Sequence, residues 1–313
     1  FIARHTLPRR GILAEPEEIL VTMGAQNALW LATQVLLTQR RTAAFEEPCY
    51  PSLRTILNQS RCHLAPVGVD GEGLIHQDIP PETDVIFATP SHQCPTTATM
   101  PLARRSALLN KAREINAVIV EDDYEFEMSF LNPPSPALKS LDREGRVIYV
   151  GSFSKSLFPG LRLGYLVGPA PFIREARALR ASVLRHPPGH IQRTVAYFLS
   201  LGHYDALIRR MSRAYLERRR VLDAAIAEFG LKVAGQATFG GSSVWMQAPE
   251  GVDTSELATR LREQSVLIEP GESFFAGPDQ PRNFYRLAYS SIPANRIREG
   301  VALIAAATKA LLG

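Results

Sequence analysis

Short runs of consecutive apolar residues alternate with stretches of helical periodicity through most of the first 190 residues. Three runs, Val85–Ala88, Ala117–Val120 and Val147–Val150, are apolar at every position, as buried strands of a parallel sheet are. Between the first two lies the stretch from Leu102 to Ile115, which is rich in Arg, Ala and Leu and favours a helix. Strands that alternate with helices predict an α/β fold with a mainly parallel sheet.

The pattern changes after His190, where helical and strand-like segments mix without regular alternation. Helical periodicity is expected over residues 191–201, 204–229, 254–264 and 296–312, and strand patterns over 241–247 and 283–289. This mixture predicts a second, smaller α+β domain. The predicted division is residues 1–14 as the remnant of an N-terminal helix or linker, 15–203 as the large domain and 204–313 as the small domain.

The predicted helix over residues 204–229 carries a basic face. Its arginines are Arg209, Arg210, Arg213, Arg218, Arg219 and Arg220. A solvated surface is the favoured interpretation of such a run over a nucleic-acid contact.

Composition narrows the class of protein. A chain of 313 residues is long enough for about two domains, and a net charge of +4 is too small to argue for nucleic-acid binding. Cys49, Cys62 and Cys94 are few and far apart, which favours a reduced, cytoplasmic setting. No apolar run is long enough to span a membrane, no signal peptide is visible, and no metal site is predicted. The chain starts at Phe1 without an initiator methionine, so a fragment of a longer protein is expected.

The segment Gly151 to Tyr165 carries the most specific chemistry. Lys155 follows the apolar run that ends at Val150 and can form a Schiff base with a carbonyl cofactor. Ser152, Ser154 and Arg162 suit an anion, because hydroxyls donate hydrogen bonds and guanidinium binds phosphate through two. An aldehyde that also carries a phosphate is pyridoxal phosphate. The alternative is a surface turn with a solvated lysine.

An acidic cluster, Glu121 to Tyr124, follows the predicted strand that ends at Val120. Residues just beyond the carboxyl ends of parallel strands face the ligand crevice. A carboxylate there could keep the pyridine nitrogen of the cofactor protonated, and Tyr124 could bond the ring hydroxyl. An ordinary acidic loop is the alternative.

Three further positions fit such a site. The strand-like Val21–Met23 turns through Gly24 into a helix that starts near Ala25 and Gln26, and a helix N-terminus favours a phosphate. Tyr50 lies in a proline-rich turn, where its ring could stack on a planar cofactor or simply pack. Arg286 lies within an apolar strand and is expected to meet a carboxylate, from either the protein or a ligand.

The order of these motifs resembles that of fold-type I pyridoxal phosphate enzymes of the aspartate aminotransferase superfamily. More narrowly, it looks like the C-terminal domain of MocR/GabR-type transcriptional regulators of the GntR superfamily. Thr89-Pro-Ser-His-Gln-Cys-Pro-Thr96 stands where ordinary enzymes carry Asn-Pro-x-Asn-Pro-Thr-Gly, and Glu121-Asp-Asp-Tyr124 has the form typical of the regulators. The resemblance covers nearly the whole chain.

The resemblance implies a role for each site residue. Lys155 would form the internal aldimine, Asp122 would pair with the pyridine nitrogen, Tyr124 with the ring oxygen, and Tyr50 would stack on the ring. Around the phosphate would lie Ala25, Gln26, Ser152 and Arg162, with Ser154 also assigned to the cofactor. Arg286 would bind the carboxylate of an effector or substrate. A homodimer with sites near the interface is implied as well.

Two functions follow from these observations. The first is an effector-sensing domain, in which an amino acid or amine forms an external aldimine and DNA is bound only through an upstream winged helix–turn–helix that is not in this chain. The second is a free-standing class I/II aminotransferase acting on amino acids. Thr97 replaces the usual glycine after Pro-Thr, and Cys94 replaces the asparagine that contacts the ring oxygen in ordinary aminotransferases. We therefore expect full transamination to be weak or absent.

Overall fold

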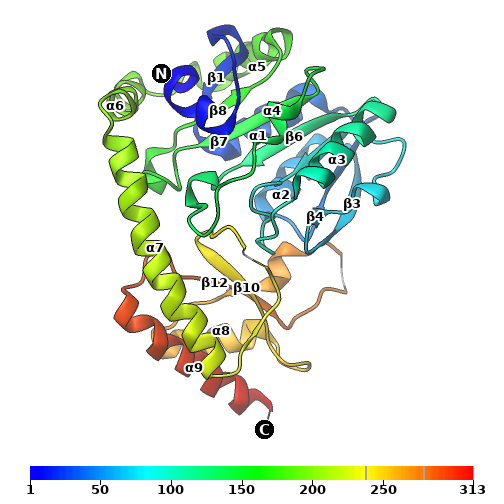
Figure 1. Cartoon of the computed structure of the whole chain (residues 1–313). Helices are drawn as coiled ribbons and strands as arrows, with labels where there is room; N and C mark the ends of the chain where they lie inside the picture. The colour runs from blue at the N-terminus through cyan, green and yellow to red at the C-terminus, as the bar shows by residue number, and fades with distance from the viewer. Residues whose placement is uncertain (237, 278, 313) are drawn as a thin grey trace.

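The computed structural model of the chain describes residues 1–236, 238–277 and 279–312. It shows an α/β unit around a large sheet, followed by a smaller unit around an antiparallel sheet (Figure 1). The long helix α7 (His203–Glu228) runs from the first unit to the second. The fold class predicted from the sequence is confirmed.

The large sheet has eight strands among the described residues, in the order β1-β8-β7-β6-β5-β2-β3-β4. Neighbours from β3 to β7 pair in parallel, whereas β1, β8 and β4 are antiparallel. The strands are β1 (Ile19–Thr22), β2 (Thr42–Glu47), β3 (His63–Asp70), β4 (Gly73–Leu74), β5 (Val85–Ala88), β6 (Val118–Asp123), β7 (Val147–Ser152) and β8 (Gly164–Val167). The three runs predicted as strands are β5, β6 and β7.

Helices cover both faces of this sheet, which is why its central strands are apolar at consecutive positions. Every residue of β5 and β7 is buried. One face packs against α1 (Gly24–Leu36), α2 (Pro51–Ser60) and α5 (Ala170–Leu184). The other packs against α3 (Leu102–Glu114) and α4 (Leu138–Leu141). The carboxyl ends of the central strands are therefore left as the edge where polar residues can gather.

The opening residues pack on the large unit as two short helical turns, η1 (Ile2–Thr6) and η2 (Leu7–Arg10). Leu7 is buried in a cluster that also contains residues of β7, β8, α7 and α6 (Gly189–Ser200). Arg10 is only 1% exposed. This segment is therefore part of the interior of the large unit in this structure.

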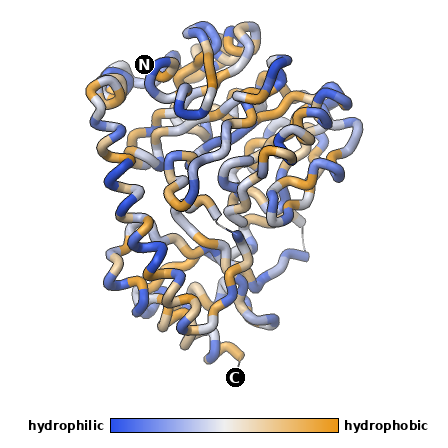
Figure 2. Tube along the Cα trace, in the orientation of Figure 1, coloured by the Kyte–Doolittle hydropathy of each residue, from blue (hydrophilic) through white to orange (hydrophobic). Residues whose placement is uncertain are grey.

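The smaller unit is a sheet in the order β11-β12-β10-β9, against which helices α7, α8 and α9 pack. Its elements are β9 (Lys232–Val233), β10 (Ser243–Gln247), α8 (Thr254–Glu263), β11 (Glu269–Pro270), β12 (Phe284–Ala288) and α9 (Ala294–Leu312). One face of α7 packs into its core through Leu222 and Ile226. Accordingly, hydrophilic and hydrophobic segments alternate along α7 (Figure 2).

The basic face of α7 is only partly solvated, contrary to the prediction. Arg209, Arg210, Arg213 and Arg220 are exposed, but Arg219 is buried and pairs with Asp223 at 2.8 Å. The guanidinium of Arg218 donates to the Ser290 carbonyl. The Arg219–Asp223 pair has the i,i+4 spacing that a helix brings together, whereas the long-range partner of Arg218 has no counterpart in the local sequence pattern. No helix within the described ranges is long and apolar enough to cross a bilayer.

Candidate functional site

A cavity of about 170 Å³ lies where the carboxyl ends of β6 and β7 meet the start of α1 and strand β12. All ten residues predicted for the site line it: Ala25, Gln26, Tyr50, Asp122, Tyr124, Ser152, Ser154, Lys155, Arg162 and Arg286. A larger hollow of about 580 Å³ near Phe1 is lined mostly by apolar side chains, so it lacks a comparable convergence of polar groups. The individual roles of the ten residues stay predictions.

One wall of the cavity is suited to an anion. Strand β1 turns into α1 at Gly24, whose φ of 81° glycine adopts readily, and the first N–H groups of a helix lack intrahelical acceptors. The guanidinium of Arg162 lies against this turn, since a Cβ added to Gly24 would be 3.3 Å from Arg162 Nη2. Ser152 Oγ accepts a hydrogen bond of 3.1 Å from the Ser154 backbone N–H. The turn, the guanidinium and the two serines thus lie on one wall of the cavity, where the sequence predicts a phosphate.

Close backbone packing brings these anion-binding groups together. A Cβ added to Gly164 would lie 2.7 Å from the carbonyl carbon of Gly24 and 2.8 Å from the carbonyl oxygen of Gly151. No real side chain tolerates such contacts, so only glycine allows β7, β8 and the start of α1 to approach this closely. Arg162, two residues before Gly164, is thereby held beside the helix N-terminus.

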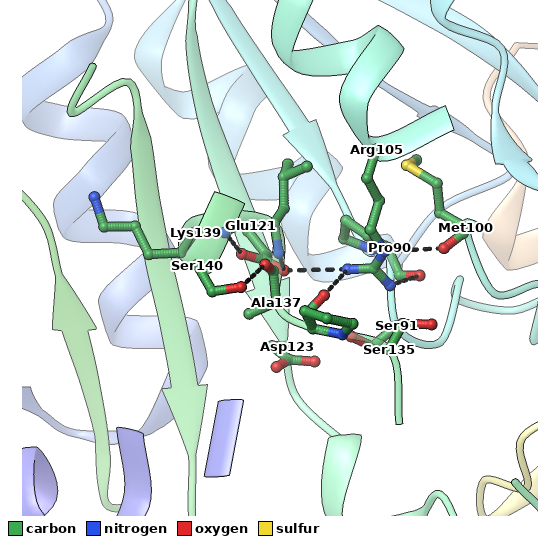
Figure 3. A network of polar contacts seen from close by, with 12 residues as sticks. Pro90, Ser91, Met100, Arg105, Glu121, Asp123, Ser135, Ala137, Lys139 and Ser140 are labelled. Atoms are coloured by element: carbon green, nitrogen blue, oxygen red, sulfur yellow. Dashed lines mark hydrogen bonds and ion pairs between the residues drawn. The ribbon is translucent and has the colours of Figure 1, made fainter. Parts of the chain in front are cut away.

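Three consecutive acids, Glu121, Asp122 and Asp123, end strand β6, and the outer two have protein partners. Glu121 accepts hydrogen bonds of 2.8 Å from the backbone N–H groups of Leu138 and Lys139 and lies 3.8 Å from Arg105 (Figure 3).

On the other side of Asp122, Asp123 accepts a hydrogen bond of 2.6 Å from Arg10 Nε and one of 2.8 Å from the Tyr149 hydroxyl. Burial opposes ionisation of Asp123, but the Arg10 guanidinium and these hydrogen bonds lower its pKa below the ordinary value. Both outer acids are therefore bound within the protein and are not free to meet a ligand.

Asp122, the middle acid, faces the cavity. Within the described parts of the chain, its buried Oδ1 has no hydrogen-bond partner. Burial raises the pKa of Asp122 to about 7, and the nearby Asp123, Glu46 and Glu121 add to the effect. A nearby cation would stabilise the ionised form of this carboxylate. The protonated nitrogen of a pyridine ring is such a cation. Buried Ser154 Oγ is likewise without a partner among the described residues.

The buried phenol of Tyr124 and the buried thiol of Cys94 both line the cavity in the neutral form. Burial raises the pKa of Tyr124 well above its ordinary value and that of the Cys94 thiol to about 12. Cys94 packs with Trp245 and Phe274, and Tyr124 lies against the same cluster. Tyr50 precedes α2 and is 37% exposed. The phenol of Tyr124 therefore remains a hydrogen-bond donor.

Lys155 lies in the turn after β7, exposed at the mouth of the cavity. The next residue, Ser156, is fully buried, and its Oγ lies 2.8 Å from the Tyr204 hydroxyl. That hydroxyl donates a hydrogen bond of 2.6 Å to Glu127. The turn is thus anchored on one side of Lys155 while the amine itself is accessible.

Arg286 has a protein carboxylate as a partner, which is one of the two alternatives that the sequence left open. Its Nη1 lies 3.1 Å from Glu269 Oε2, and its Nε donates a hydrogen bond of 3.1 Å to Ser243 Oγ. Because Arg286 also lines the cavity, it can meet a ligand as well.

Sequence reasoning missed several residues that shape the site. Thr89 lines the cavity and donates to Glu46, whose pKa burial raises to about 7. Arg10 and Arg105 support the acidic strand end, and Glu269 holds Arg286. Thr89 belonged to a recognised motif, so its place could have been inferred. The partners of the other three lie too far along the chain for any local pattern to show.

The chain belongs to the aminotransferase class I and II family, whose sequence model matches residues 2–304. It is 59% identical over 309 residues to the HTH-type transcriptional regulator TauR of Rhodobacter capsulatus, covering 99% of this chain and 64% of that protein. It is 31% identical to the probable rhizopine catabolism regulatory protein MocR of Rhizobium meliloti, covering 99% of this chain and 63% of that protein. The resemblance to these regulators is confirmed, and the chain spans less than two thirds of their length.

Solved structures agree with the fold. The crystal structure of LysN, an alpha-aminoadipate aminotransferase of Thermus thermophilus, superposes with a TM-score of 0.89 at 30% identity and covers 99% of this chain and 83% of that one. That protein was crystallised in complex with N-(5'-phosphopyridoxyl)-L-leucine. The fold-type I architecture is therefore established for this chain.

Proposed function

We propose that this chain is the pyridoxal phosphate-binding, effector-sensing domain of a transcriptional regulator. The observation that carries the proposal is the carboxylate of Asp122, whose buried Oδ1 has no partner in the described part of the chain. It lies between two partnered acids and lines the same cavity as Lys155, Ser152 and Arg162. Family membership and the phosphopyridoxyl ligand of LysN support the same cofactor.

The bound cofactor supplies an aldehyde that condenses with amines and a ring that withdraws electrons. Lys155 offers the accessible amine for attachment. Asp122 would hold the proton on the ring nitrogen, Tyr124 would donate to the ring oxygen, and Tyr50 would pack on the ring. The start of α1 at Ala25 and Gln26, together with Ser152, Ser154 and Arg162, would bind the phosphate.

An amino acid or amine is the proposed effector, with Arg286 receiving its anionic group. Its binding shifts a conformational equilibrium of this domain, and that shift changes how an upstream winged helix–turn–helix binds DNA. The names of TauR and MocR support this role, because both are regulatory proteins that extend beyond the part matched here. The proposed setting is the cytoplasm.

A homodimer is also proposed. In the isolated chain the phosphate side of the cavity is open, with Gln26, Tyr50, Lys155 and Arg162 all exposed. A second subunit against this side would exclude water from the cofactor.

Two positions favour sensing over sustained transamination. Cys94, with its thiol protonated, lines the cavity at the place of an amide that contacts the ring oxygen in ordinary aminotransferases. Thr97 adopts a left-handed φ of 62°, which is unfavourable for a β-branched residue and is the conformation that the usual glycine adopts freely.

The first test locates the cofactor. Protein loaded with pyridoxal phosphate should be yellow, and borohydride reduction followed by peptide mapping should place the pyridoxyl group on Lys155. A pyridoxyl group on another lysine, or on none, contradicts the proposal.

The second test separates a sensor from an enzyme. For a panel of amino acids and amines, the change in cofactor absorbance is compared with keto-acid production over many turnovers. We expect spectral change with little or no keto acid, both for this chain and for a version extended upstream. Rapid, sustained turnover would establish the aminotransferase alternative instead.

A further inference from the structure

Glu269 binds one of the guanidinium nitrogens through which Arg286 would hold an anionic ligand. The two residues are direct cross-strand neighbours, because the register of β11 and β12 pairs Glu269 with Arg286. Their ion pair of 3.1 Å engages Nη1 of Arg286. A ligand carboxylate that binds this guanidinium must therefore compete with a carboxylate of the protein.

The side chains of Arg286 and Glu269 differ in exposure and in the number of contacts that hold them. Arg286 is 21% exposed and is also held by Ser243 Oγ, whereas the Glu269 side chain is 52% exposed. Half-exposed ion pairs contribute little to stability, because water solvates the released carboxylate well. The guanidinium is thus fixed at the cavity wall, and its glutamate partner can leave at little cost.

The backbone that carries Glu269 is held on both sides. Before it, α8 ends at Glu263 and packs against α9. After it, η7 (Gly271–Phe274) reaches the large unit, where the Phe274 carbonyl accepts hydrogen bonds of 2.9 Å from the Cys49 N–H and 3.1 Å from Arg54. Release of Arg286 therefore requires only rotation of the Glu269 side chain, without movement of the strand.

We propose that Glu269 is an exchangeable partner of Arg286 that an arriving anionic group displaces, and that it thereby sets which anionic ligands the site accepts. Weakly competing anions fail to displace it. A carboxylate that binds the guanidinium through two hydrogen bonds succeeds. This inference rests on the proposed function for the ligand site, but the competition itself does not involve the cofactor.

The test uses glutarate, an anion without an amino group, titrated by calorimetry into the parent protein and into E269Q, R286A and E272Q. Glu272 is exposed on the same segment and lies 3.4 Å from Ser255 Oγ, so E272Q removes an equal charge without touching Arg286. We expect E269Q to bind glutarate about two- to fivefold more tightly, E272Q to match the parent, and R286A to bind at least tenfold more weakly.

Weaker or unchanged binding by E269Q would overturn the proposal and make Glu269 a fixed support of Arg286. Equal tightening by E272Q would also overturn it, since the effect would then be general electrostatics. Failure of glutarate to bind any variant excludes Arg286 as an anion site. All titrations are run with and without pyridoxal phosphate. If the protein takes up no cofactor, the proposed function is contradicted. The titrations without cofactor still show whether E269Q binds glutarate more tightly than the parent does.

Discussion

Neighbouring carboxylates on one strand end differ in charge state because their partners differ. Asp123 is held by Arg10, whereas Asp122 meets no cation among the residues that the structure describes, and burial raises its pKa to about 7. The pKa of Asp122 is near 4 in the unfolded chain and about 7 in the folded protein. At a pH between these two values, the folded state therefore binds more protons than the unfolded state. The free energy of unfolding therefore falls as pH rises through this window, and the whole loss caused by ionising Asp122 is reached above pH 7.

The variant D122N should separate stability from cofactor binding. A shift of about three pKa units corresponds to roughly 4 kcal/mol, and solvent screening at the open cavity reduces the effect to about half. At pH 8 we expect cofactor-free D122N to melt several degrees above the parent, with little difference near pH 4. Its affinity for pyridoxal phosphate should fall at least tenfold. Thermal unfolding and absorbance titration measure the two effects.

D123N is the matched control for D122N. It leaves the cavity intact but weakens the bond to Arg10, so we expect a lower melting temperature and nearly parental cofactor absorbance. If D123N perturbs the cofactor spectrum and D122N does not, the assignment of the ring partner is wrong.

At the scale of elements, the β1–α1 turn depends on Gly24. An alanine at this position would have to adopt the left-handed φ of 81°, and its Cβ would lie 3.3 Å from Arg162 Nη2. We expect G24A to lose about 1–2 kcal/mol of stability through the left-handed conformation and also to bind pyridoxal phosphate several-fold more weakly. Chemical denaturation and cofactor titration test these outcomes.

Gly230 offers a control with the same backbone strain at a distance from the site. Its φ is 65°, and a Cβ there would meet no atom of the described residues within 4 Å. G230A should lose similar stability with unchanged cofactor affinity. Parallel losses of cofactor affinity in both variants would show that the effect of G24A is only strain.

Elements and site were predictable where the signal is local. The runs that became β5, β6 and β7 are apolar at every position because helices cover both faces of the sheet. Residues at the carboxyl ends of parallel strands meet at one edge, so Asp122 and Lys155 could be expected in one cavity.

Pairings between distant segments were not predictable. Glu269 lies on a strand of only two residues, and nothing in its own sequence indicates that it pairs with Arg286. Arg10 was assigned to an opening remnant because its partners lie more than 80 residues away. A charged residue within an apolar segment indicates that the buried charge needs a partner. The sequence does not indicate which distant residue that partner is.

At the scale of the whole molecule, Arg10 ties the opening turns to the strand that carries Asp122. It bonds Asp123 at 2.6 Å, Ser135 O at 2.7 Å and Ser91 Oγ at 2.9 Å. Removing one partner of a buried ion pair typically costs 3–5 kcal/mol, because the other charge stays buried. We expect R10A to destabilise the protein by about that amount, measured by chemical denaturation.

The adjacent Arg9 provides the comparison. It pairs with Asp205 and lies over the Tyr204 ring, but its side chain is 29% exposed. R9A should therefore cost about 1 kcal/mol or less. Equal losses in the two variants would contradict a special role for the buried pair.

The unpartnered acid at the end of β6 has a consequence for how long the protein survives in a cell. A ligand present at a hundred times its dissociation constant adds about 2.7 kcal/mol to the folded state, and under the proposed assignment the contact of the ring nitrogen with Asp122 is part of that binding energy. Chains made during a shortage of the vitamin precursor would unfold more often and be degraded sooner. The abundance of the protein would then rise and fall with vitamin B6 nutrition, apart from any response to an effector.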